Sequence, residues 1–236
     1  NVTKLLEHYS VDGSVVLVLE RACCSLANWM ANPKDKNTRI LVRYVAHQII
    51  QGLVVVHSLG YVHRDVKRDN VLLFSDGKVK LTDFGSVISV EEAVCSRHFP
   101  AGTPQYFPPE AALTSGYDQK FDVWSFGVML FFMMTGSHHH ELRCQNSKMM
   151  KPVLKTVLKK QRLSFRRYKT NLKNEDIEFF KKVLSIRKQS RSSSRACLDL
   201  PFIKDWHVDL GVEGTIKEVK NVTRILLELE RLCYLM

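Results

Sequence analysis

Four polar residues have the types and the spacing to do chemistry together. Asp65 and Lys67 lie two positions apart, Asn70 follows three positions later, and Asp83 comes thirteen positions after Asn70. A carboxylate can accept a proton, an ammonium group can neutralise a phosphate, and carboxylate and amide oxygens can ligate a hard cation. These side chains predict a site that handles a phosphate group and a metal ion, provided that the fold brings them together.

Short strands around these residues would bring them together. Residues 71–74 and 78–82 have the character of strands, and Ser75-Asp76-Gly77 between them is a tight-turn signal. Because the two strands of a hairpin run antiparallel, Asn70 and Asp83 would emerge on the same side. Elsewhere, the sequence pattern predicts strands over residues 3–9 and 14–20 and helices over residues 38–58, 120–134, 151–161 and 174–186.

The pattern as a whole resembles a known family. The string His63-Arg64-Asp65-x-Lys67-x-x-Asn70, followed by Asp83-Phe84-Gly85, is similar to the catalytic loop and magnesium-binding triplet of eukaryotic protein kinases. The lysine two positions after the aspartate resembles the serine/threonine type. Three further motifs match the family, namely Gly102-Thr103-Pro104-Gln105-Tyr106, Pro108-Pro109-Glu110 and Asp122-Val123-Trp124-Ser125-Phe126-Gly127. The resemblance covers roughly residues 1–207.

The resemblance implies an α+β, protein-kinase-like fold. We expect a mainly α-helical large lobe with short β-hairpins and a truncated small lobe. The first helix of the large lobe would begin with residues 25–32. Residues 1–22 would be the remnant of the small lobe and the hinge, residues 23–207 the large lobe, and residues 208–236 an amphipathic helix added at the C-terminus. That helix would either dock on the large lobe or bind a partner. More finely, residues 69–74 and 202–206 resemble SH3-binding-domain kinases, and residues 108–110 resemble Pim kinases.

The resemblance also implies roles in phosphoryl transfer from ATP to the Ser or Thr hydroxyl of a protein substrate. Asp65 would accept or orient the substrate hydroxyl, and Lys67 would sit on the γ-phosphate of the bound ATP. Asp83 and Asn70 would hold Mg²⁺ ions. Such a protein would be a serine/threonine-protein kinase.

The nucleotide's base would lie against a second group of residues. The family's hinge falls on residues 20–22, so the backbone groups of Glu20 and Ala22 would hydrogen-bond adenine. Leu19, just before the hinge, would gate the back of the pocket, and Leu72 would form its floor.

Two buried acids are also implied by the family motifs. Asp122 would hold the backbone of the catalytic loop through hydrogen bonds, because a buried carboxylate needs such partners. Glu110 would be buried too and would need a cation, for which Arg195 stands at the family position.

Half of the family's nucleotide site has no counterpart in these residues. No GxGxxG occurs, and no strand lysine precedes the catalytic loop. Since the first residue is Asn rather than Met, we expect a fragment of a longer enzyme, and residues 1–236 alone should bind ATP·Mg²⁺ poorly. The alternative is a pseudokinase or scaffold module without chemistry, although a scaffold has no need for all four polar residues. An aminoglycoside-kinase type lacks the Pro-Glu and Asp-x-Trp-x-x-Gly elements.

Charge is concentrated in one segment. Residues 143–195 hold 17 Lys and Arg against 3 acids, within a chain whose net charge is +11. The positive electrostatic potential of such a segment attracts acidic peptides, nucleic acid or anionic membranes. The other interpretation is that the charges lie on a solvated helical face. An acidic partner at residues 143–195 is therefore one hypothesis.

Composition restricts the class of protein. With 236 residues and 45 % hydrophobic residues, the chain is long and apolar enough to fold as a globular protein. The six cysteines form no CxxC pair, which predicts free thiols in a reducing compartment. No signal peptide opens the chain, and the longest apolar run, residues 126–134, is too short to span a bilayer. We therefore expect a soluble, intracellular and cytoplasmic protein without a membrane span, whose oligomeric state stays unknown.

Overall fold

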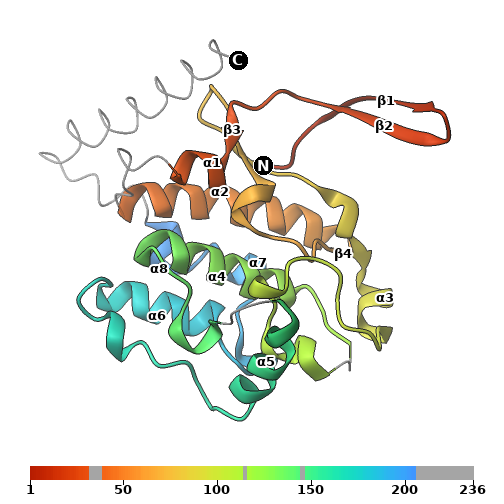
Figure 1. The fold of residues 1–236 in the computed structure, drawn as a ribbon. Coiled ribbons are helices and arrows are strands. Elements are labelled where there is room, and N and C mark those ends of the chain that lie inside the picture. The colour runs from red at the N-terminus through yellow and green to blue at the C-terminus, as the bar shows by residue number, and fades with distance from the viewer. Residues whose placement is uncertain (32–38, 114–115, 144–146, 206–236) are drawn as a thin grey trace, which may run out of the picture.

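A computed structural model describes residues 1–31, 39–113, 116–143 and 147–205 of the chain (Figure 1). The predicted helix over residues 208–236 and the proposed helix start at Thr38 lie outside the described residues. Within the described part, the strands are β1 (Leu5–Val11), β2 (Ser14–Leu19), β3 (Cys24–Ser25), β4 (Tyr61–Val62), β5 (Val71–Leu73), β6 (Val79–Leu81) and β7 (Ile88–Ser89). The helices are α1 (Leu26–Met30), α2 (Arg39–Ser58), α3 (Val90–Cys95), α4 (Lys120–Thr135), α5 (Met150–Leu158), α6 (Asn174–Val183), α7 (Ser194–Cys197) and α8 (Pro201–Lys204).

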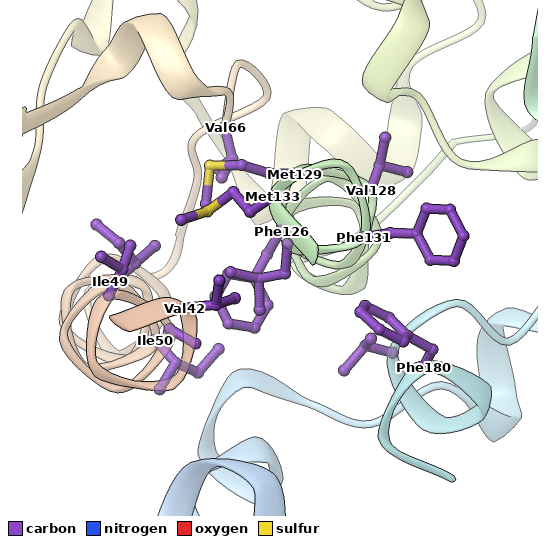
Figure 2. Close-up of a cluster of buried hydrophobic side chains, with 14 of the residues drawn as sticks. Val42, Ile49, Ile50, Val66, Phe126, Val128, Met129, Phe131, Met133 and Phe180 are labelled. Atoms are coloured by element: carbon purple, nitrogen blue, oxygen red, sulfur yellow. The ribbon is translucent and has the colours of Figure 1, made fainter. Parts of the chain in front are cut away.

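Helices α2 and α4 form the centre of the core. Helix α4 is apolar on all sides and almost entirely buried, as its sequence predicts for a central helix. Val42 and Ile49 of α2 lie opposite Phe126 and Met133 of α4, and Phe180 of α6 lies below α4 (Figure 2). This packing fixes the helical body from which the catalytic loop projects.

Helix α2 is apolar enough to pass a membrane-span test by length and composition alone. Of its most apolar window, however, 67 % is buried inside the protein. The helix contacts α4, α7, α8 and β6 there. Burial of this kind is typical of a core helix.

The strands form three small antiparallel sheets. The first pairs β1 with β2, the second has the order β3-β5-β6, and the third pairs β4 with β7. The predicted hairpin over residues 71–82 is confirmed, with Gly77 at φ +80° in its turn. Thr82 donates its backbone N–H to the carbonyl oxygen of Asn70 at 3.0 Å, so the residues on either side of this hairpin are neighbours as predicted.

The hairpin β1–β2 extends away from the helical body (Figure 1). Its turn has Asp12 at φ +49° and Gly13 at φ +77°, the left-handed conformations that a tight hairpin turn requires. The first strand begins at Leu5 rather than at residue 3, because Thr3 instead donates its N–H to the carbonyl oxygen of Leu81. Large apolar side chains of the hairpin are exposed, namely Leu5, Leu6, Tyr9, Val11, Val15, Leu17 and Leu19.

Some sequence predictions need correction in their limits. The helix predicted over residues 25–32 is shorter, since α1 spans only Leu26–Met30 behind its Ser25 cap. The helices predicted over residues 151–161 and 174–186 end earlier, at Leu158 and Val183. The prediction of six free thiols is wrong for Cys23, which is placed in a disulfide, whereas Cys24, Cys95 and Cys197 are free.

Candidate active site

The catalytic loop starts at β4 and is held by a buried aspartate of α4. The two carboxylate oxygens of Asp122 accept hydrogen bonds from the backbone N–H groups of His63 and Arg64, each at 2.8 Å. Nε2 of His57 lies 2.8 Å from the same carboxylate. Arg64 has φ +66°, a left-handed conformation that is uncommon for residues other than glycine. These contacts confirm the predicted role of Asp122 and fix the turn that presents the next residue, Asp65.

The carboxylate of Asp65 is the point at which the predicted catalytic residues meet. Its Oδ2 accepts hydrogen bonds from Nζ of Lys67 at 2.7 Å and from Nδ2 of Asn70 at 2.9 Å. Its Oδ1 accepts from the backbone N–H of Thr103 at 2.9 Å and from the Thr103 hydroxyl at 2.7 Å. Three of the four polar residues singled out in the sequence are therefore in direct contact.

These contacts set the protonation state of Asp65. Burial disfavours the charged form, but hydrogen bonds from Lys67 and Thr103, together with the charge of Lys67, outweigh it and lower the pKa of Asp65 below its usual value. At neutral pH the side chain is a carboxylate, which is the state that a proton acceptor needs.

Thr103 is a site residue to which the sequence analysis assigned no role. Its hydroxyl bridges the two predicted catalytic side chains, because it also accepts a hydrogen bond from Nζ of Lys67 at 2.8 Å. The preceding residue, Gly102, has φ +113°, and a Cβ there would overlap the carbonyl oxygen of Arg64. Glycine is therefore required for the segment to approach the catalytic loop so closely. The Gly-Thr pair within the family motif was the available signal.

The second carboxylate, Asp83, follows Thr82, whose backbone N–H donates to the carbonyl oxygen of Asn70, so Asn70 and Asp83 flank the same end of the β5–β6 hairpin. Asp83 has φ +60°, an uncommon conformation for a residue other than glycine, and its Oδ1 accepts only a 3.3 Å hydrogen bond from Gly85 N–H within the described residues. Asn70 uses its Nδ2 as a donor to Asp65, which leaves its amide oxygen available. One carboxylate and one amide oxygen are hard donors, and this set fits Mg²⁺, which takes few protein ligands and completes its shell with phosphate oxygens and water.

The residues predicted to hold adenine flank the start of β3. Leu72 is opposite Lys80 in the β5–β6 ladder and opposite Ser25 of β3. Nζ of Lys80 lies 2.6 Å from each carboxylate oxygen of Glu20, which connects the predicted hinge to this sheet. Leu19 ends the exposed hairpin and is 40 % exposed. The structure thus brings Glu20 close to Leu72 through a residue, Lys80, to which the sequence analysis gave no role.

The ion pair also affects the ionisation of Glu20. Burial opposes ionisation, but hydrogen bonds from the Lys80 side chain and the Lys4 backbone outweigh it and lower the pKa of Glu20 below its usual value. The carboxylate of Glu20 is therefore charged at neutral pH.

Glu110 is buried, as predicted, but its partner is not the predicted one. Arg191 forms two parallel hydrogen bonds with the Glu110 carboxylate, at 2.7 and 2.9 Å, and its guanidinium also lies over the Trp124 ring. Arg195 instead lies on α7 and is exposed. The loop before α7 turns Arg191 inward, so the assignment of Arg195 as the partner of Glu110 was wrong.

Comparison with known proteins agrees with this architecture. Residues 1–203 match the protein kinase domain family, and the chain belongs to that family. Members of the family use ATP and a divalent metal and act on protein substrates. The α+β kinase-like fold expected from the sequence is confirmed.

The relatives of this chain include several serine/threonine-protein kinases. The chain is 34 % identical over 149 residues to the serine/threonine-protein kinase SKM1 of Saccharomyces cerevisiae, covering 58 % of this chain and 22 % of that protein. It is 36 % identical over 128 residues to CLA4 of Eremothecium gossypii, covering 54 % of this chain and 16 % of CLA4. It is 32 % identical over 182 residues to pakB of Dictyostelium discoideum, covering 76 % of this chain and 20 % of pakB. The matched regions span roughly a fifth of the length of these relatives. The closer resemblances to SH3-binding-domain and Pim kinases stay predictions.

Proposed function

We propose that this chain carries the catalytic part of a serine/threonine-protein kinase, which transfers the γ-phosphoryl group of ATP to Ser or Thr hydroxyls of protein substrates. The observation that carries the proposal is the Asp65 carboxylate, kept ionised and oriented by Lys67, Asn70 and Thr103. The alternative of a scaffold without chemistry gives no reason for this convergence.

The proposed roles follow from how phosphoryl transfer works. The reaction passes through a loose transition state, so the protein contributes positioning and charge neutralisation more than covalent chemistry. The Oδ1 side of Asp65, where the Thr103 hydroxyl now donates, is where a substrate hydroxyl would be oriented and lose its proton. Nζ of Lys67 would neutralise the γ-phosphate.

Metal and nucleotide would occupy the ends of the neighbouring strands. Asp83 and Asn70 would hold Mg²⁺, which supplies charge neutralisation to the phosphates when bound. The backbone of Glu20 and Ala22 would bind adenine, with Leu72 beneath it and Leu19 at the back. We divide the chain accordingly into residues 1–22 as small-lobe remnant and hinge, 23–207 as large lobe, and 208–236 as a C-terminal extension.

The test is a phosphate-transfer assay with ATP, Mg²⁺ and a basic protein as acceptor, on the full-length product and on residues 1–236. Asp65→Ala should reduce the rate of the full-length product by about 10²- to 10⁴-fold, the usual contribution of a positioned proton acceptor. The matched control is Asp76→Ala, an exposed aspartate at the opposite end of the β5–β6 hairpin, which should leave the rate unchanged. An Asp65→Ala rate within threefold of wild type would contradict the role of Asp65.

The same assay decides between the two candidate functions. The specific observation that favours a scaffold is that residues 1–236 contain neither a GxGxxG nor a strand lysine before the catalytic loop. A full-length product that binds its protein partners but transfers no phosphate would support the scaffold. Residues 1–236 alone should show weak ATP·Mg²⁺ binding and very slow transfer, because two strands cannot cover the nucleotide.

A further inference from the structure

A hollow in the helical body lies away from the catalytic loop. It is formed by the loop that follows α5 and by helix α6, and its volume is about 390 Å³. Four basic residues line it, Arg162, Arg166 and Lys169 from the loop and Lys181 from α6, and no carboxylate is among the lining residues. We call this feature the basic hollow.

The floor of the basic hollow is apolar. Phe165 and Ile177 line it and are each only 7 % exposed, and Leu163 beside them is 4 % exposed. All three belong to the main hydrophobic core, and Phe165 stacks against Phe180 with 6.2 Å between the ring centroids. A floor packed into the core is a preformed surface, which a ligand can use without reordering the protein.

Acidic residues near the basic hollow are engaged elsewhere. Glu175 and Asp176, at the start of α6, pair with Arg39 of α2 at 2.6 and 2.8 Å. Glu141 pairs with Lys160 and accepts the backbone N–H of Ser164. Glu141 thus contacts the hollow's edge at Ser164, but its charge is paired with Lys160, which does not line the hollow. None of these three carboxylates forms a salt bridge with Arg162, Arg166 or Lys169 in the part of the chain that the structure describes.

Three of the four lining cations therefore have no acidic partner in the part of the chain that the structure describes. Lys181 pairs with Glu178 one turn earlier on α6, at 2.6 Å. Arg162, Arg166 and Lys169 are exposed and form no salt bridge with a described residue. Cations that line the same hollow repel one another, so an anionic ligand bound among them would relieve this repulsion.

We propose that the basic hollow is a docking site for an acidic peptide segment of a protein partner. Carboxylates of the peptide would pair with Arg162, Arg166 and Lys169, and one apolar side chain would rest on Phe165 and Ile177. Arginine and carboxylate match in geometry through paired hydrogen bonds. The apolar floor favours a peptide, because a peptide can present an aliphatic side chain directly between its carboxylates. A nucleic acid would have to turn a base toward the floor instead, which the oligonucleotide measurement below tests. A concave site of a few hundred Å³ also suits a side chain better than a flat membrane surface. This binding is independent of phosphoryl transfer.

The experiment measures binding of a fluorescein-labelled peptide, Asp-Glu-Asp-Leu-Asp-Glu-Asp, to the full 236-residue chain by fluorescence anisotropy. The hollow variant carries Arg162→Glu, Arg166→Glu and Lys169→Glu. The matched control carries Lys155→Glu, Lys159→Glu and Lys182→Glu, which make the same change in net charge at exposed positions outside the hollow. We expect the hollow variant to weaken binding at least about tenfold, since three partly exposed pairs together contribute roughly that factor. The control variant should weaken binding less than about threefold.

Two further arms test the floor and the class of ligand. Replacing the central Leu of the peptide by Ser should weaken binding to the wild-type chain, and equal binding would remove the apolar part of the proposal. Equal weakening in both triple variants, or no peptide binding at low salt, would overturn the proposal. So would tighter hollow-dependent binding of a single-stranded oligonucleotide or of phosphatidylserine vesicles. A triple Arg162→Gln, Arg166→Gln and Lys169→Gln variant serves if circular dichroism shows that the charge-reversed one is unfolded.

Discussion

Two hairpins of similar apolar composition lie in different environments in this protein. The β1–β2 hairpin has strands of seven and six residues, and Val15 and Leu17 within it are 67 % and 58 % exposed. The β5–β6 hairpin has only three residues in each strand, yet Val71 and Leu81 are fully buried. Strand length therefore does not decide which hairpin can carry a site.

Contacts outside the ladder make the difference. The hydroxyl of Tyr44 on α2 donates to the carbonyl oxygen of Gly77 in the β5–β6 turn at 2.9 Å. Oε1 of Gln48, also on α2, accepts from the N–H of Val79 at 2.9 Å. An isolated two-stranded hairpin is only marginally stable in water, so burial and these side-chain anchors hold β5–β6 in place. The metal-ligand candidates stand on the hairpin that is fixed in this way.

The largest effect on stability should come from removing the partner of a buried charge in the helical body. Arg191→Leu would leave Glu110 buried and unpaired, which should reduce the free energy of unfolding by about 3 to 5 kcal/mol. The matched control is Arg195→Leu, at an exposed position, which should change it by less than about 0.5 kcal/mol. Urea unfolding of both variants measures this. Equal losses of unfolding free energy in the two variants would contradict the assignment of Arg191 as the partner of Glu110.

A pair of identical substitutions compares the two hairpins directly. Leu81→Ala on β6 should reduce the free energy of unfolding by about 3 kcal/mol, because a fully buried leucine leaves a cavity when truncated. Leu17→Ala on β2 should reduce the free energy of unfolding by less than about 1 kcal/mol, because that side chain is largely exposed. Urea unfolding midpoints at constant m-value give both numbers. A loss at Leu17 as large as at Leu81 would mean that a second copy or another segment covers the β1–β2 hairpin in solution.

The smallest effect on stability concerns the Lys80–Glu20 ion pair, which connects β6 to the predicted hinge. Lys80→Met should reduce stability at pH 7 by about 0.5 kcal/mol, since the Lys80–Glu20 pair is only partly buried. The pKa of Glu20 is lowered in the folded state, so the pair's contribution is present above the unfolded pKa and is lost as pH falls through the folded pKa. The difference between wild type and Lys80→Met should therefore close in acid.

Urea midpoints measure this closing when they are taken at neutral pH and at a series of acidic pH values that extends below the lowered pKa of folded Glu20. The control is Lys78→Met, two positions before Lys80, whose ammonium group pairs with exposed Asp76. This variant should differ less from wild type at neutral pH. A gap between wild type and Lys80→Met that persists unchanged in acid would show that Lys80 acts through packing of its aliphatic stem rather than through Glu20.

The sequence by itself determined the features that depend on local spacing. The Ser75-Asp76-Gly77 turn sets the β5–β6 hairpin, and with it the position of Asn70 and Asp83 at the same end of that hairpin. The contact of Asp65 with Lys67 and Asn70 likewise follows from three residues in one short loop. The apolar residues on all sides of α4 predicted its burial. In each case the partners are close along the chain or share one periodic element, so local conformation is enough.

The tertiary structure decided the partners that are far apart along the chain. Arg191 rather than Arg195 reaches Glu110, because four residues change which side of a loop faces the core. Thr103 meets Asp65 only because Gly102 lets the segment approach Arg64 closely, and Lys80 meets Glu20 across 60 positions of sequence. The excess of positive charge was visible in the sequence, but its concentration around an apolar floor was not. Such contacts depend on how elements pack in three dimensions, which neither composition nor periodicity specifies.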